Sequence, residues 1–538
     1  MTKLSLRADF IAGLSLAGLL LPEAVAYAGL AGLPPQAGVI ALFAGLLCYA
    51  VLGTSRFAIV SATPSSAAVL LAATSELAGH DVQLRLTLSA ALILLCGALF
   101  ITAWLARLGG IANFIAKPVL RGFAFGLAIT IVIKQLPHIL GVMPSSSSLF
   151  QAGTELLRHW RDWNPASLLT GFGALILLQW LKRRPHLPGA LLVIALGIAL
   201  NLSGLMAAYG VPEVGAFNLA LAMPSLPVMS REQWLPLSGL AFALTLIVYA
   251  ESYGSITTFA LRHGDRAAPN RDLLALGAAN LISGLLHGMP VGAGYSATSA
   301  NEAAGAKSRL AGLVAAAMIL LLVATLLPLI AHTPQPMLAA IVIHAVGHTL
   351  SLATLRPYFR WHRDRQIVLA AIVAVLALGV VNGLLTAIAL SLVLLLHRLS
   401  EPRLSWLGRL DNGHDFVDIV RHPDAVMPPG LLIVRPDLPL FFANADGIFA
   451  EIRARLAEDH GTHTLVLSLE ESDDLDSSSL EALADFAAFV KRSGRRLLLA
   501  RVKDRVRDLL ANARLPALQS VAEVWSVDDA VREASDVS

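Results

Sequence analysis

SATPSSAAVLLAA at residues 61–73 and SATSANEAAGAKS at residues 296–308 both begin with the tripeptide Ser-Ala-Thr. Each run of small residues lies in a region long enough to span a membrane. A carboxylate precedes each copy, Glu23 in the first half of the chain and Glu251 in the second. Each half of the chain therefore contains a carboxylate and a short helix whose N-terminal residues are polar. This arrangement predicts a binding site where the two halves meet. This pattern is typical of an inverted-repeat secondary transporter.

The composition divides the chain into an apolar part and a polar part. Of its 538 residues, 56% are hydrophobic and 14% are charged, whereas a soluble domain has about 25% charged residues. Charged residues become frequent only from Glu401 onwards. We therefore predict a transmembrane domain over residues 1–400, a linker over 401–429 and a soluble domain over 430–538. The net charge of +3 is too small to indicate a nucleic-acid-binding protein.

Fourteen segments are candidates for membrane-spanning helices, each of which needs about 20 mainly apolar residues. The third and the tenth begin with serine and threonine, which leaves only a half-length apolar helix in each. The set predicts two inverted repeats of seven spans. The candidates are 9–30, 36–53, 57–78, 84–106, 111–141, 166–182, 189–208, 236–260, 272–289, 295–304, 309–331, 336–352, 367–382 and 383–399.

Most basic residues of the apolar part gather in alternate loops, whereas Arg158, Arg161 and Arg231 lie on the opposite side among acidic residues. Loops rich in basic residues face the cytoplasm, so both termini and the soluble domain are predicted to be cytoplasmic. The residues that define these loops are Arg56, Arg107, Lys117, Lys182, Arg183, Arg184, Arg262, Arg266, Arg271, Lys307, Arg309, Arg356, Arg360, Arg363, Arg365, Arg398 and Arg403.

The polar part of the chain has an alternating strand and helix pattern. LLIVR at 431–435 and TLVLSL at 464–469 are typical of buried strands. Residues 444–457 and 480–490 have helical periodicity, and the turn from Asp476 to Ser479 caps the second of these helices. Another strand, 497–500, and another helix, 503–513, follow. These elements predict a small α/β domain.

The motifs of both parts resemble those of one known family. LDSSSLEALADFAAFVKRSGRRLLLARVKDRVRDLL at 475–510 and FFANAD at 441–446 are similar to STAS domains. LLPEAVAYAGLAGLPPQAG at 20–38, YAVLGTSR at 49–56 and LGAANLISGLLHGMPVGAGYSATSANEAAGAKS at 276–308 resemble the membrane signatures of the sulfate permease or solute carrier 26 family. The resemblance covers nearly the whole chain, and the motifs occur in the family's order.

The resemblance implies an anion carrier that works by alternating access. Spans 1–4 and 8–11 would form a core that moves against a gate of spans 5–7 and 12–14. A homodimer in the bacterial inner membrane is expected. The sequence contains no pattern typical of a catalytic triad, a metal cluster or a nucleotide loop, so we expect no cofactor and no enzymatic activity.

The two runs of small residues predict the anion site. A helix N-terminus carries a partial positive charge and unpaired N–H groups, so two such ends could hold an anion without a basic side chain. Alternatively, the small residues only allow the helices to pack closely. The candidate substrate-binding residues here are Ser61, Ala62, Thr63, Ser296, Ala297 and Thr298.

Two carboxylates lie inside apolar spans, where a bare charge costs about 2.5–3.5 kcal/mol or more. Glu251, with Ser255 one turn later, is a candidate site for a coupling proton or cation, as the resemblance also implies. Glu23 and Tyr27 are expected by resemblance to face the substrate. The alternatives are a carboxylate at 251 that is only hydrogen-bonded, and one at 23 that caps a helix broken after Pro22.

The departures from the family pattern concern charge. Many relatives have a basic residue where this chain has Ala297, and many have glutamine in place of Glu23. An anion facing two carboxylates is repelled unless a proton or a metal cation is bound. The sequence therefore favours symport coupled to protons, or to another cation such as sodium, with sulfate, bicarbonate, chloride and dicarboxylates all open as substrates.

Other functions are compatible with parts of the sequence. An anion exchanger or channel, or a nucleobase carrier, would have the same fold, although the GTSR and STAS segments disfavour the nucleobase carrier. A membrane-anchored STAS signalling protein is a further alternative, but an anchor needs only one or two spans. Ser477 occupies the position that is phosphorylated in soluble STAS relatives and is a candidate regulatory site, or else part of a plain helix cap.

Overall fold

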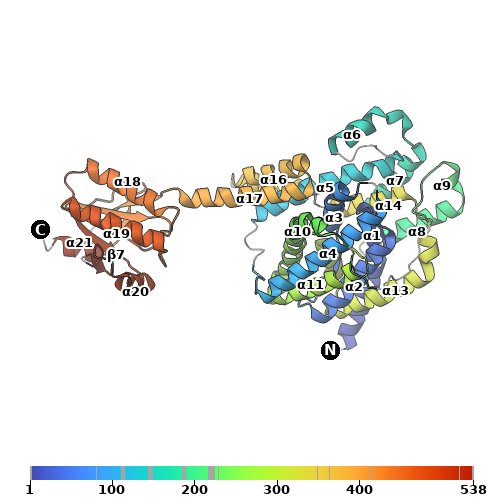
Figure 1. Cartoon of the computed structure of the whole chain (residues 1–538), viewed down its shortest axis with the longest axis horizontal. Coiled ribbons are helices and arrows are strands. Elements are labelled where there is room, and N and C mark those ends of the chain that lie inside the picture. The colour runs from blue at the N-terminus through green and yellow to red at the C-terminus, as the bar shows by residue number, and fades with distance from the viewer. Residues whose placement is uncertain are drawn as a thin grey trace. The chain divides into compact units, whose positions relative to one another are not determined.

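The chain folds into two units, Met1–Ser391 and Leu392–Ser538, which are described separately (Figure 1). The structure is a computed structural model. It describes residues 3–79, 81–110, 116–142, 149–183, 189–215, 224–227, 229–347, 349–362, 364–411, 413–519 and 521–535.

The first unit is helical, and in its described residues a helix occupies the place of each of the fourteen predicted spans. Among the described residues, seven helices are long and apolar enough to cross a membrane. The first seven spans are α1 (Lys3–Leu30), α2 (Pro35–Leu52), α3 (Pro64–Ala78), α4 (Val82–Leu105), α5 (Lys117–Leu140), α7 (Pro165–Leu181) and α8 (Gly189–Leu202). The second seven are α10 (Arg231–His263), α11 (Pro269–Leu285), α12 (Tyr295–Ala303), α13 (Leu310–Ile330), α14 (Gln335–Gly347), α16 (Arg365–Leu378) and α17 (Val380–Ser400).

Short elements lie between these spans. They are α6 (Leu149–Arg158), η2 (Trp160–Asp162), α9 (Leu205–Ala208), η3 (Leu352–Thr354) and α15 (Arg356–Arg360). Residues 111–115, with which the fifth candidate span begins, lie outside the described residues.

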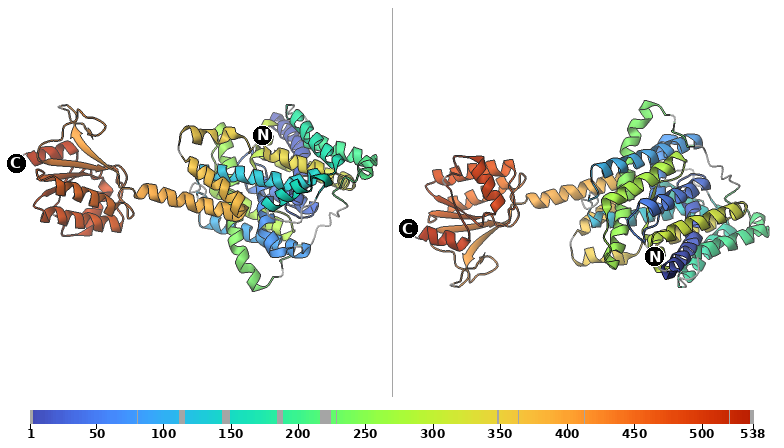
Figure 2. Two further views of the ribbon diagram at one scale, coloured as in Figure 1. Left: turned by 90° about the horizontal axis from the view of Figure 1, so that it is seen from above. Right: turned by 90° about the horizontal axis from the view of Figure 1, so that it is seen from below.

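The spans form one helical bundle (Figures 1 and 2), within which we name two sets of helices by their contacts. We call α1–α4 with α10–α13 the core group, in which α4 packs on α11 and α1 packs on α13. We call α5, α7, α8, α14 and α16 the gate group, in which α5 packs on both α14 and α16. Small residues allow close packing in this group, since a Cβ atom on Gly122 of α5 would lie 2.5 Å from the carbonyl oxygen of Val368 on α16.

The two half-length helices are joined at their N-terminal ends by a short antiparallel sheet. β1 (Val60–Ala62) precedes α3, β2 (Val291–Ala293) precedes α12, and Ser61 lies opposite Gly292. Thr63 is the N-cap of α3 and Gly294 is the N-cap of α12. Two broken spans therefore meet end to end inside the core group.

This pairing corrects the interpretation of the repeated tripeptide. The first Ser-Ala-Thr lies in β1 and at the N-cap, whereas the second lies within the first turn of α12. Counted from the N-caps, Ser296 is the counterpart of Ser65, and Ser61 is the counterpart of Gly292. The half-helices are related to each other, but the two tripeptides are not at equivalent positions.

The second unit is a six-stranded sheet with the order β4-β3-β5-β6-β7-β8. β5 to β8 are parallel, and the hairpin of β3 and β4 adds antiparallel strands at one edge. The elements are β3 (Leu404–Arg409), β4 (Phe416–Asp418), β5 (Leu431–Pro436), α18 (Ala445–Glu458), β6 (Thr464–Ser468), α19 (Ser477–Arg492), β7 (Arg496–Ala500), α20 (Asp504–Ala513), β8 (Ala522–Val524) and α21 (Val527–Ser535).

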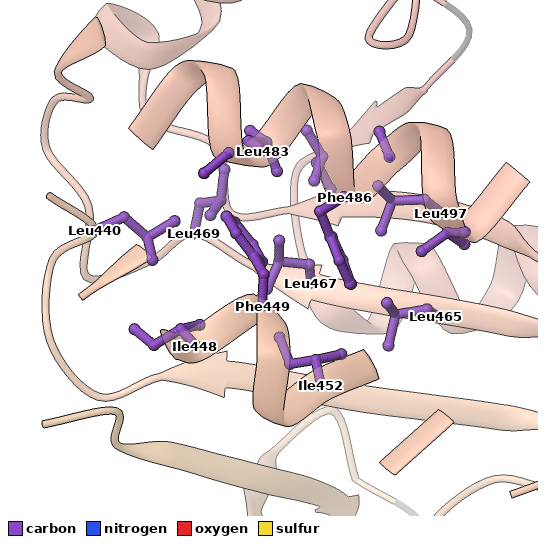
Figure 3. Close-up of a cluster of buried hydrophobic side chains, with 14 of the residues drawn as sticks. Leu440, Ile448, Phe449, Ile452, Leu465, Leu467, Leu469, Leu483, Phe486 and Leu497 are labelled. Carbon is purple, nitrogen blue, oxygen red and sulfur yellow. The ribbon is translucent and has the colours of Figure 1, made fainter. Parts of the chain in front are cut away.

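Helices cover both faces of this sheet (Figure 2). Leu465 and Leu467 pack with α18 and α19 on one face, whereas Val466 packs with α21 on the other. Phe449 of α18 and Phe486 of α19 stack with their ring centroids 4.7 Å apart (Figure 3). Residues 401–429 were predicted to be a linker. They contain β3 and β4, so they are not a linker throughout.

Candidate functional site

The predicted site residues come together around one cavity of about 450 Å³ in the first unit. Its walls include the N-terminal ends of both half-helices, as well as parts of α1, α5, α10 and α14. Among the residues predicted from the sequence, those that line it are Glu23, Tyr27, Ser61, Ala62, Thr63, Glu251, Ser255, Ser296 and Ala297.

Thr298 does not line the cavity. Its side chain is fully buried, and its Oγ1 accepts a hydrogen bond of 3.3 Å from the backbone N–H of Ile59. One turn later in α12, Asn301 Nδ2 donates to the carbonyl oxygen of Phe57 at 2.9 Å. These residues attach α12 to the segment before β1, so Thr298 supports the site without facing it.

The N-terminal end of α3 is closed by side chains. Thr63 and Ser66 form a capping box, with Thr63 Oγ1 accepting from the N–H of Ser66 at 3.1 Å and Ser66 Oγ accepting from the N–H of Thr63 at 3.0 Å. Glu251 of α10 lies against the same end, where its carboxylate accepts from Thr63 Oγ1 at 3.1 Å and from Ser65 Oγ. A helix N-terminus stabilises a carboxylate in this position.

The N-terminal end of α12 lacks such a cap. Gly294 offers no side chain, and no side-chain hydrogen bond caps this helix. Ser296, in the first turn, is exposed to the cavity. On the other side of the N-cap, Ser252 of α10 accepts from the N–H of Ala293 at 2.8 Å and so fixes the strand before the helix. The first turn is therefore held in place while its donors remain open to the cavity.

Glu23 and Tyr27 project into the cavity from α1, one turn apart, just after the proline within this helix at position 22. Glu23 is 7% exposed and Tyr27 is 2% exposed. In the described part of the chain, the carboxylate of Glu23 has no hydrogen-bond or ion-pair partner, so it does not cap a broken helix. A buried carboxylate that faces a cavity in this way needs a proton, a cation or a water molecule.

Ser255, one turn after Glu251, is the polar group that most directly indicates a ligand. Its side chain is 2% exposed and lines the cavity, and its Oγ has no partner among the described residues. Buried hydroxyl groups are nearly always hydrogen-bonded, so the unsatisfied Oγ of Ser255 is a position for an ordered water molecule or an ion.

The cavity also includes two basic residues that the sequence interpretation missed as site residues. Lys117 and Arg121 of α5 line it from the gate group. Arg121 Nη1 donates to the carbonyl oxygen of Thr354 at 3.1 Å, and its guanidinium lies 5.5 Å from the ring centroid of Tyr358. The signal in the sequence is their spacing of four residues, which places both on one face of a helix.

Ser477 lies in the second unit, at the start of α19, and is exposed. Asp476 caps this helix as predicted, accepting from the N–H and the Oγ of Ser479 at 2.8 Å each. Although burial alone raises the pKa of the Asp476 carboxyl, hydrogen bonds from Ser479 and from the N–H of Phe442 outweigh it and lower this pKa below its usual value. The cap is thus ionised, and a modification of Ser477 stays a prediction.

Two broken spans that meet at a carboxylate-lined cavity, in a helical unit followed by a small α/β domain, define a secondary membrane transporter. Comparison with known proteins agrees with this class. Residues 6–372 match the model of the sulfate permease family, and residues 422–534 match that of the STAS domain. The chain belongs to the sulfate permease family, whose members transport anions and are not enzymes.

Individual relatives extend over nearly the whole chain. A probable sulfate transporter of Mycobacterium tuberculosis is 32% identical over 518 residues, which cover 95% of this chain and 92% of that protein. The human solute carrier family 26 member 6 is 29% identical over 479 residues, which cover 84% of this chain and 63% of that protein.

Solved structures confirm the fold. The murine solute carrier 26 family member A9 anion transporter in the inward-facing state matches with a TM-score of 0.93 at 21% identity, covering 100% of this chain and 92% of that one. The transmembrane domain of a cyanobacterial bicarbonate transporter matches with a TM-score of 0.64 at 20% identity, covering 71% of this chain and 98% of that one. The predicted fold class, fourteen spans in two inverted repeats with a STAS domain, is confirmed by the first of these.

Proposed function

We propose that this chain carries out secondary active transport of a small anion of the sulfate, bicarbonate or dicarboxylate class, coupled to a proton or sodium ion that moves in the same direction. The observation that supports this most directly is the difference between the two half-helix ends in one cavity. One end holds the carboxylate of Glu251, and the other has no side-chain cap.

The open end of α12 is the proposed anion site. Its first-turn N–H groups and the hydroxyl of Ser296 would donate to the anion, and the missing side chain of Gly294 lets the anion approach the backbone. Ala297, 3% exposed, contributes no charge at this end. The backbone dipoles and the Ser296 hydroxyl then supply the local attraction.

The closed end of α3 is the proposed coupling site. A cluster of oxygen atoms is formed there by Glu251, Thr63 Oγ1 and Ser65 Oγ. The Oγ of Ser255, which has no partner among the described residues, lies one turn away on α10. Hard cations such as sodium prefer oxygen ligands, and a single proton on Glu251 would neutralise the same cluster. Bound there, either species would offset the repulsion between Glu251 and the anion.

An anion exchanger is the second candidate. Lys117 and Arg121 bring positive charge into the same cavity, so an anion could be held without a coupling cation. The position of these residues in the gate group, away from the half-helix ends, is the reason to rank this candidate second.

Uptake into proteoliposomes containing the full-length chain tests the proposal. Sulfate, bicarbonate, oxalate and chloride would each be offered at several values of external pH, with and without a sodium gradient. Symport predicts accumulation that rises with an inward proton or sodium gradient. Uptake that ignores both gradients, but is stimulated by an anion inside the vesicle, would establish exchange and overturn symport.

The same proposal includes three further features. The core group moves against the gate group, the protein forms a homodimer, and both termini lie in the cytoplasm. Crosslinking of the protein in its native membrane would report the dimer. Protease access to the STAS domain in sealed inside-out vesicles would report the side of the C-terminus.

A further inference from the structure

The charged side chains of the transport cavity are divided between its two walls. Glu23 of α1 and Glu251 of α10 belong to the core group, whereas Lys117 and Arg121 belong to α5 of the gate group. In the described part of the chain none of these four side chains forms an ion pair. Glu251 is hydrogen-bonded only to Thr63 and Ser65. The two cations are therefore not neutralised by the two carboxylates that share their cavity.

The gate cations are fixed in place by the packing of α5. Gly122 and Gly126 bring this helix close to the backbone of α16, because a Cβ atom on Gly126 would lie 3.2 Å from the carbonyl oxygen of Ile372. The guanidinium of Arg121 is oriented by the carbonyl oxygen of Thr354 and by the ring of Tyr358. Neither of these partners carries a charge, so the positive charge of Arg121 remains available to an anion.

The cations lie at one end of the cavity. Lys117 is in the first turn of α5, and the nearby lining includes Thr258, close to the end of α10, and Thr349, just beyond α14. The basic loops of the sequence place these three helix ends on the cytoplasmic side. The half-helix ends and both carboxylates line the same cavity from the core group, at positions within the spans and not at these helix ends.

We propose that Lys117 and Arg121 form an anion-attracting pair that serves only one side of the membrane, the side to which this cavity leads. They would take the place of the basic residue that is missing at Ala297, but from the gate rather than from the core. This inference rests on the proposed function of the cavity. It assigns to the pair a role in the capture and release of a small inorganic anion, such as sulfate, on that side.

The consequence is an asymmetric transporter. When the core group carries the half-helix ends to the opposite side, the gate cations stay behind, and the anion there meets only backbone dipoles and a coupling ion. Fixed cations at the mouth of a cavity raise the local anion concentration, and salt screens this effect over about 8–10 Å at ordinary ionic strength. The affinity on the cation side should therefore depend on these residues and on ionic strength, whereas the affinity on the other side should not.

The test compares the double variant Lys117→Gln/Arg121→Gln with Lys182→Gln/Arg183→Gln. The second variant also removes two positive charges, but from exposed positions at the end of α7. These positions belong to the gate group and lie outside the cavity. Sulfate transport would be measured in both directions in proteoliposomes whose orientation is known from protease access to the STAS domain. We expect the KM for sulfate on the cavity side to rise roughly tenfold at low ionic strength in the first variant only.

Three readouts separate an electrostatic role from a structural one. The KM on the opposite side should stay within about twofold, and the tenfold effect should shrink as salt is added. The charge-conserving double variant Lys117→Arg/Arg121→Lys should have the wild-type KM. Equal changes on both sides, a salt-independent change, or a variant that behaves like its control would overturn the inference while leaving the transport function intact. A wild-type protein that transports none of the screened anions would overturn the proposed function itself.

Discussion

The two half-helices share one frame but differ in chemistry. α3 and α12 both follow a three-residue strand, and these strands pair with each other. The α3 end is filled by the Thr63–Ser66 capping box and by the carboxylate of Glu251. The α12 end has glycine at its N-cap and no side-chain cap. Equivalent backbone geometry thus presents a carboxyl group at one end and a helix end without a side-chain cap at the other.

Pseudo-symmetry in such a fold therefore does not imply that the N-terminal ends of the two half-helices have the same chemistry. A helix N-terminus attracts any anion, including a carboxylate of the protein itself. Where the protein supplies its own carboxylate, the end becomes a place for a proton or cation. Where it supplies none, the end stays available for the substrate. Changing one end should therefore leave the function of the other intact.

The largest effect is expected for Glu251→Gln, which removes the charge at the α3 end. Removing one member of a buried, charged hydrogen-bonded cluster costs about 2 kcal/mol or more, which is roughly thirtyfold in affinity for the coupling ion. Accumulation driven by a proton or sodium gradient should disappear, while binding of the anion at the α12 end persists. Gradient-driven uptake into proteoliposomes, with sulfate binding measured separately by calorimetry, would show both.

Glu23→Gln is the matched comparison for that variant. It removes the other cavity carboxylate, which has no partner in the described residues. If Glu251 is the coupling group, coupling should survive this change. Coupling that is lost in Glu23→Gln and retained in Glu251→Gln would move the coupling site to α1.

The next largest effect is expected for Ala297→Arg, which adds a fixed positive charge to the α12 end. The guanidinium would partly replace the coupling ion, so the dependence of uptake on the proton or sodium gradient should fall by about tenfold, equivalent to about 1.4 kcal/mol. Initial rates at graded sodium concentration and pH would measure this dependence. If a variant that still transports depends on the gradient as the wild type does, the α12 end does not hold the anion beside a coupling ion at the α3 end. If the arginine variant fails to fold, Ala297→Lys tests the same point with a smaller side chain.

The sequence predicted the fourteen helices because apolar runs in a membrane have few alternative structures. It also placed most of the STAS domain, where alternating apolar residues such as Leu465, Val466 and Leu467 face the two layers of helices. It failed for β3 and β4, because their residues lie between prolines and their strand structure depends on pairing, of β3 with β5 and of β4 with β3.

The site was predictable in its members but not in its asymmetry. The repeated tripeptide, the intramembrane carboxylates and the family resemblance pointed to nine residues that do line the cavity. The equivalence of the half-helices, however, depends on which residue ends each strand. Thr298 was assigned to the cavity because a tripeptide pattern does not reveal the direction of its third side chain. Lys117 and Arg121 were missed because the cavity surface of α5 depends on how the gate group packs against the core group.

A smaller effect is expected for Gly294→Ala at the α12 end. The backbone of Gly294 has φ of −67°, so alanine is not strained there. Its Cβ would lie 3.2 Å from Thr63 Cγ2 and would narrow the approach to the helix donors. The KM for the anion should rise about three- to tenfold, or about 0.7–1.4 kcal/mol, without a change in coupling. Gly173→Ala in α7, whose Cβ would meet nothing within 4 Å, is the control. A shift in sodium or pH dependence, rather than in the anion KM, would reverse the assignment of this end.

The smallest effect is expected for Ser65→Ala, which removes one of the two hydrogen bonds to Glu251 and leaves the one from Thr63. Loss of a single such bond is worth about 1 kcal/mol, so the affinity for the coupling ion should fall roughly fivefold while the anion KM at saturating coupling ion stays constant. Ser75→Ala in the same helix is the control, because its Oγ donates only to the carbonyl oxygen of Leu71. If Ser65→Ala instead weakens anion binding at saturating coupling ion, the anion contacts both half-helix ends, and the contrast between a substrate end and a coupling end is wrong.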